Sequence, residues 1–114
     1  MDIEIIKDTI SKVKVKQLAL ATFGDMVKAV ADIEKGIMAI GGELHADAEA
    51  LLLADGSLQA NLWGFNIYPE KPIDEQLEFT SLINIKPSLG NRSMEIQSIE
   101  IKAQIKKIFA KLIQ

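Results

Sequence analysis

The stretch MVKAVADIEKGIMAI, residues 26–40, predicts a β-hairpin, the starting point for an antiparallel sheet. Val and Ile, which favour strands, recur on both sides of a single break at residues 34–36. Gly36 in this break can take the positive φ that a tight reversal requires. The pair Gly41-Gly42 then ends the second strand. We therefore expect two antiparallel strands here.

Two more strands are expected further along the chain, at LWGFNIY (62–68) and LEFTSLINIK (77–86). The second alternates apolar and polar residues, as a half-buried strand does. The loop PEKPIDEQ, which carries two prolines, joins them. The two strands should be antiparallel neighbours, and with the hairpin they predict a sheet of about four strands.

The N-terminal part predicts a helix over residues 11–23, with Ser11 as its cap and Gly24 as its stop. Its VKVK run also alternates like a strand, so the first turn is open to both interpretations. The preceding residues, IEII (3–6), could form a short edge strand.

A short middle helix is expected at residues 46–54, where strong helix formers precede Asp55-Gly56. The rival interpretation is a second hairpin, since Asp-Gly between apolar runs also favours a hairpin turn. A last helix begins at Ser98 and carries an apolar stripe. The fold class is therefore α+β: residues 1–114 form one domain, an antiparallel sheet with N-terminal, middle and C-terminal helices packed mainly on one face.

Composition and charge argue against two classes of protein, those that bind nucleic acids and those that span membranes. The chain has 114 residues, 13 basic and 16 acidic side chains, and no cysteine. The net charge of −3 argues against nucleic-acid binding. The first residues are acidic rather than basic, and no apolar run approaches the ~20 residues of a membrane span. Together with the lack of thiols, this predicts a cytoplasmic protein with no membrane partner.

The stretch GGELHADAEA, residues 41–50, places the chain's one histidine among three carboxylates. In a helix, His45 and Glu49 are i, i+4 neighbours at the first turn and can converge on one ligand. In an extended segment, Glu43, His45 and Asp47 share a face instead. A histidine among carboxylates suits a divalent metal, and the metal ligands that we expect here are His45, Asp47 and Glu49. The alternative is structural: Asp47 caps the helix or occupies its first turn, and Glu49 complements its dipole.

The loop KPSLGNRS, residues 86–93, combines Lys86, Asn91 and Arg92 shortly before a helix. Such residues suit a phosphate, sulfate or carboxylate, with Arg92 as the clamp. Gly-Asn is also a turn signal, and Arg92 could pair with an acid of the same chain. Trp63 should serve the core, whereas Asn66 faces the opposite side of its strand and would need a polar partner there.

Three stretches, GGELHADAEALLLADGS, LWGFNIYP and SLINIKPSLGNRS, resemble a small family of uncharacterised prokaryotic proteins, a domain of unknown function. The resemblance spans nearly the whole chain. It supplies no activity, substrate or cofactor, and it implies a prokaryotic, cytosolic source. The unusual residues within the matching stretches are His45, Asp47, Trp63, Asn66, Asn91 and Arg92.

Two functional hypotheses follow. The first is a soluble binding or interaction module that holds a small anionic ligand or a protein partner near Arg92 and Trp63, with a homodimer as one form. The expected ligand-binding residues are Arg92, Asn91, Trp63, Asn66 and Lys86. The alternative is a metal-dependent hydrolase, in which His45, Asp47 and Glu49 hold a divalent metal and Arg92 positions an anionic substrate. A third interpretation is a purely structural protein, in which the same residues serve only as helix caps and turns. Catalysis requires that the region of His45 and the loop of Arg92 meet in space.

Overall fold

The predicted hairpin lies in the middle of the sheet, as strands β2 (Val27–Asp32) and β3 (Ile37–Gly41). The computed structural model describes residues 2–114. Gly36 has the expected positive φ, +69°. The buried Asp32 side chain completes the turn, since one of its oxygens accepts hydrogen bonds of 2.9 Å from the backbone N–H groups of Glu34 and Lys35.

The sheet has five antiparallel strands in the order β1-β3-β2-β4-β5. The predicted strand at residues 62–68 is β4 (Leu62–Ile67), which pairs with β2 along its whole length. The IEII segment forms β1 (Ile3–Ile6), paired with β3 at one edge. This edge strand raises the count from the expected four to five.

At the other edge, β5 (Leu77–Glu78) is much shorter than the strand predicted over residues 77–86. The chain then leaves the sheet and forms the 3-10 turn Leu82–Asn84. The Ser81 hydroxyl starts this turn by accepting a hydrogen bond from the Ile83 N–H at 3.3 Å. The prediction of a long strand was therefore wrong beyond Glu78.

The buried side chain of Asn84 takes the place of the missing strand beside Gly64 of β4. It donates to the Gly64 carbonyl at 2.9 Å and accepts from the Gly64 N–H at 2.8 Å. A Cβ on Gly64 would lie 2.6 Å from the Cβ of Ser81, so a side chain at this position would push the segment away.

The three predicted helices are α1 (Lys12–Ala21), α2 (His45–Ala54) and α3 (Ile99–Leu112). Ser11 and Ser98 cap α1 and α3 as expected, because each hydroxyl accepts a backbone N–H three residues later. The middle helix is confirmed and the rival hairpin is wrong, since Asp55-Gly56 ends α2 rather than turning between strands.

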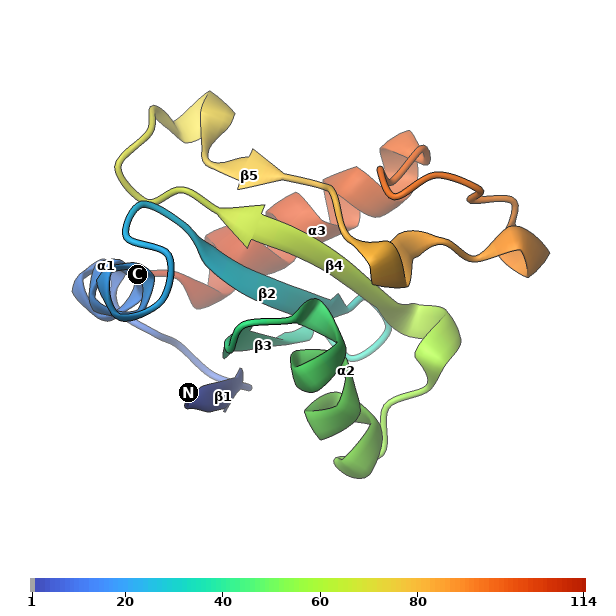
Figure 1. Cartoon of the computed structure of the whole chain (residues 1–114), viewed down its shortest axis with the longest axis horizontal. Coiled ribbons are helices and arrows are strands. Elements are labelled where there is room, and N and C mark those ends of the chain that lie inside the picture. Colours follow the sequence, from blue (N-terminus) through green and yellow to red (C-terminus); the bar gives the residue numbers. More distant parts are fainter. Residues whose placement is uncertain (1) are drawn as a thin grey trace.

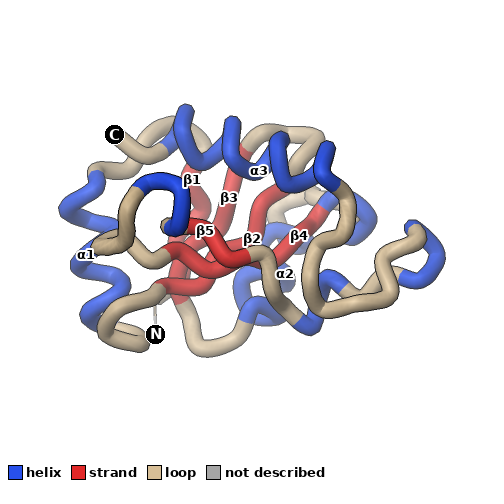
Figure 2. The backbone as a smooth tube through the Cα atoms, turned by 90° about the horizontal axis from the view of Figure 1, so that it is seen from above, coloured by secondary structure: helices blue, strands red, loops and turns tan. Residues whose placement is uncertain are grey.

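The helices lie on both faces of the sheet (Figures 1 and 2). Helices α1 and α3 cover one face, and their apolar side chains join Trp63 and Phe65 in the larger core. Helix α2 covers the opposite face, where Ala48 and Leu52 pack on Val30. The expectation of helices mainly on one face thus holds for two of the three.

The N-terminal and C-terminal helices are tied together where α3 ends. The Ile10 N–H donates to the Leu112 carbonyl at 2.8 Å, and the Gln114 N–H donates to the Ile10 carbonyl at 2.9 Å. This pairing fixes α1 beside the end of α3. Within residues 2–114, no helix has both the length and the apolar character needed to cross a membrane.

Candidate functional site

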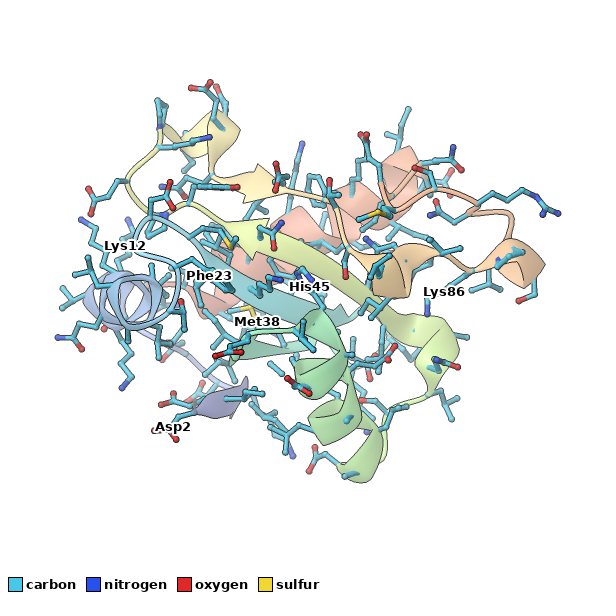
Figure 3. All side chains as sticks on the ribbon, in the orientation of Figure 1. Asp2, Lys12, Phe23, Met38, His45 and Lys86 are labelled. Carbon is cyan, nitrogen blue, oxygen red and sulfur yellow. The ribbon has the colours of Figure 1, made fainter. Side chains whose placement is uncertain are left out.

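His45 begins α2, and its ring lies over the middle of the sheet (Figure 3). Its Nε2 is 2.9 Å from the carbonyl oxygen of Phe65. A carbonyl can only accept, so Nε2 carries the proton and donates it to this bond. The side chain is 7% exposed. His45 therefore anchors the start of α2 on β4.

Burial is the main cause that lowers the pKa of His45, because an imidazolium loses hydration in this position. The hydrogen bond to the Phe65 carbonyl acts in the opposite direction, and Lys28 lowers the pKa further. The environment thus favours the neutral imidazole with its hydrogen on Nε2.

Asn66 is the polar neighbour of His45 on this face of the sheet. Its amide donates to a Glu78 carboxylate oxygen at 2.8 Å, and the Tyr68 hydroxyl approaches the same oxygen at 3.3 Å. The Asn66 amide oxygen is buried and has no donor among residues 2–114. The structure therefore brings His45, from the predicted metal group, beside Asn66, from the predicted ligand group.

The three predicted metal ligands do not form one group. His45 faces the sheet, whereas Asp47 is an exposed acid in the first turn of α2, whose N-cap is Leu44. Glu49 lines a cavity with Lys86. Within residues 2–114, no three His, Asp or Glu side chains are close enough together to hold a metal ion.

Asn91, predicted to bind an anion, organises its own loop instead. Its amide nitrogen lies within 3.1 Å of the carbonyls of Asn84, Ser93 and Glu95. Its oxygen accepts from the Gln97 N–H at 2.8 Å. The side chain is buried and its donors and acceptor are used within the loop. Asn91 therefore holds the chain in place before α3.

The other predicted ligand residues point to different places. Arg92 is exposed and makes no ion pair or side-chain hydrogen bond among residues 2–114. Trp63 is 1% exposed in the larger core. The Lys86 ammonium lies 5.4 Å from the Trp63 ring centroid and donates to the Gln59 carbonyl at 3.0 Å. Arg92, Trp63 and Asn66 thus do not share a site.

Lys86 and Glu49 do meet, in a cavity of about 440 Å³ between α2 and residues 82–89, which we call the Lys86 cavity. The Lys86 side chain is 9% exposed. Burial lowers the pKa of Lys86, and the Glu49 carboxylate opposes this change. One residue from each of the two predicted groups therefore lines this cavity.

A larger cavity, of about 620 Å³, lies between α1, the end of α3 and the β4–β5 connection. We call it the lysine-rimmed groove. Its polar lining is Lys12, Lys16, Asp74, Gln76 and Lys106. Its apolar lining is Val15, Ile67, Pro69, Ile73, Leu77, Phe79, Phe109, Ala110 and Ile113. The volume lies in the range of ligand pockets, roughly 300–1,000 Å³.

Sequence reasoning missed this groove. Lys106 and Phe109 belong to the last helix, for which the sequence predicts only an apolar stripe. The residues come from three separate regions, so no local motif marks them. The one local signal is the VKVK run, residues 13–16, because two of its neighbouring residues, Val15 and Lys16, line the groove.

Comparison with known proteins identifies the family. The family model described as "Protein of unknown function (DUF5674)" matches residues 4–112. The chain belongs to this family. The predicted resemblance to a domain of unknown function is thereby confirmed. No curated protein matches the chain, and no solved structure matches it either.

The DUF5674 match covers both cavities. Of the residues that line them, Ile113 alone falls outside the matched range. Each cavity is therefore built from the part of the chain that the DUF5674 family defines.

Proposed function

We propose that this protein is a binding module whose lysine-rimmed groove holds a small amphipathic carboxylate. The ligand has an apolar body and one anionic head. The observation that carries this proposal is the combination of an apolar floor with an excess of positive charge at the rim. The proposed ligand is still the small anion expected from the sequence. Its proposed site, however, is the lysine-rimmed groove and not the region of Arg92.

The floor of the groove is suited to an apolar body. Phe79 and Phe109 contribute aromatic rings, and Val15 and Ile67 belong to the buried core beneath them. Transfer of apolar surface from water to such a floor is favourable by about 25 cal/mol per Å². This term supplies affinity without selecting a particular ligand.

The rim selects an anion. It holds three lysines, Lys12, Lys16 and Lys106, against the single carboxylate of Asp74, which leaves a formal excess of two positive charges. Lys16 pairs with Glu70 at 3.4 Å. Lys12 and Lys106 form no ion pair within residues 2–114. Two ammonium groups are therefore available to a ligand head group.

Titration with octanoate, followed by calorimetry, tests the proposal. We expect octanoate to bind more tightly than octylamine, which has the same chain with the opposite charge. Lys106→Gln should weaken octanoate binding roughly two- to fivefold, the range of a partly exposed ion pair. Lys107→Gln is the matched control, because Lys107 is next to Lys106 on α3 but does not line the groove. Equal binding of octanoate and octylamine would contradict the proposal.

For the compartment, we propose the cytoplasm of a prokaryotic cell. The lack of cysteine is consistent with a reducing compartment, where disulfides do not form. Fractionation of cells that express the protein with its own signals would test this assignment. Recovery from a membrane or extracellular fraction would contradict it.

A further inference from the structure

Lys86 and Lys12 lie on opposite sides of the molecule in Figure 3, and the Lys86 cavity shares no lining residue with the lysine-rimmed groove. The cavity also differs from the groove in its charges. One carboxylate, Glu49, and one ammonium group, Lys86, line it together. A site of this kind selects for a ligand that carries both charges.

The Glu49 side chain lines the cavity and has one buried acceptor that no donor among residues 2–114 uses. Its Oε2 atom is buried and has no hydrogen-bond donor among residues 2–114. A carboxylate can only accept, and a buried oxygen without a donor is unfavourable. When the Glu49 side chain turns this oxygen toward the cavity that it lines, an ammonium group of a ligand would supply the missing donor.

Lys86 has unused donors. An ammonium group has three N–H bonds, and the Gln59 carbonyl takes one of them at 3.0 Å. Lys86 and Glu49 do not form an ion pair with each other in the described part of the chain, residues 2–114. Each charge is thus available to a third group within the cavity.

Apolar side chains complete the lining. Leu82, Ile85 and Leu89 line the cavity and are also among the exposed large apolar residues. An aliphatic side chain of a ligand would cover them. A ligand with only an amine would leave Lys86 without a counter-charge, and a dicarboxylate would be repelled by Glu49.

We propose that the Lys86 cavity binds a free α-amino acid with an apolar side chain. Glu49 accepts from the ligand's ammonium group, Lys86 donates to its carboxylate, and the side chain packs on Leu82 and Leu89. The site is separate from the lysine-rimmed groove, and this inference stands whether or not the groove binds a carboxylate.

The test compares L-leucine with two probes that share its aliphatic body but carry one charge each, isoamylamine and 4-methylpentanoate. Fluorescence of Trp63, the only tryptophan, serves as the readout, because Lys86 lies 5.4 Å from its ring. Calorimetry confirms each affinity. We expect L-leucine to bind about tenfold more tightly than either probe, since each lost charged hydrogen bond is worth roughly that factor.

Variants locate the binding. Glu49→Gln should weaken L-leucine binding about tenfold but should not weaken the binding of 4-methylpentanoate, which has no ammonium group. Asp47→Asn removes the same charge from the exposed side of α2 and should change nothing. Lys106→Gln, in the groove, should also leave L-leucine binding unchanged. The inference is overturned if L-leucine binds no better than the single-charge probes, or if Glu49→Gln binds it like the unaltered protein.

Discussion

The side chain of Asn84 forms two hydrogen bonds with the backbone of Gly64, one as donor and one as acceptor, at 2.9 and 2.8 Å. This is how a neighbouring strand would bond to the same residue. The amide also donates to the Met94 carbonyl at 3.1 Å. The Asn84 side chain therefore extends the hydrogen bonding at the sheet edge and holds residues 82–97 there. Part of this segment, within residues 82–89, lines the Lys86 cavity.

Asn84→Ala should lower the free energy of unfolding by about 2–5 kcal/mol, because it leaves the buried N–H and carbonyl of Gly64 without partners. Urea denaturation measures the change. Asn61→Ala is the control, since the Asn61 side chain makes no hydrogen bond within residues 2–114. Similar stabilities of the two variants would argue against the role given to Asn84.

His45 should make stability depend on pH. Burial lowers its pKa in the folded state below the ordinary value of 6.5, so the unfolded chain binds a proton first as pH falls. Stability from this group is complete above pH 6.5 and is lost as pH falls from there to the lower folded pKa.

Glutamine in place of His45 can still donate to Phe65 but does not titrate. We therefore expect the melting temperature of His45→Gln to fall less than that of the unaltered protein between about pH 7.5 and pH 5.5. Parallel curves for the two proteins would exclude a contribution from His45.

Divalent metals should not stabilise the protein through His45. The Nε2–H bond to Phe65 is already formed, and the described residues hold no group of three metal-binding side chains. Thermal melts with Zn²⁺, Mn²⁺, Ni²⁺ and Mg²⁺ test this. A rise in melting temperature that disappears in His45→Ala would instead restore the metal-dependent hydrolase as a hypothesis.

Ile73 offers a test of the groove that does not disturb the core. It lines the groove on the 3-10 turn Ile73–Glu75, yet 82% of it is exposed. Ile73→Ser should weaken octanoate binding roughly fivefold through lost apolar contact. The free energy of unfolding should stay within about 0.5 kcal/mol, as for other surface changes. Unchanged affinity would show that the ligand does not reach this turn.

Local patterns predicted most of the elements. The hairpin at Gly36 and the capped helices at Ser11 and Ser98 depend on backbone preferences of a few adjacent residues, which the sequence displays directly. Residues 77–86 were misread because alternation cannot distinguish a strand from a segment that a side chain, Asn84, attaches to the sheet. Tertiary packing, and not a local sequence pattern, likewise determines which face of the sheet α2 covers.

The candidate sites were predicted only in part. His45 and Glu49 were both predicted as metal ligands, but their spatial neighbours, Asn66 and Lys86, come from a distant strand and a distant loop. The folding of the sheet brings His45 close to Asn66 and places Glu49 in one cavity with Lys86, which no local pattern shows. The lysine-rimmed groove left no compact motif, because α1, the β4–β5 connection and α3 each supply a few of its residues.

Amide chemical shifts recorded during a titration with octanoate test whether the lysine-rimmed groove holds an amphipathic carboxylate. We expect the shifts to concentrate at residues 12–16, 73–79 and 106–113 and to saturate with octanoate. Shifts centred on the Lys86 cavity, or no saturable shifts at the groove, would contradict the proposal.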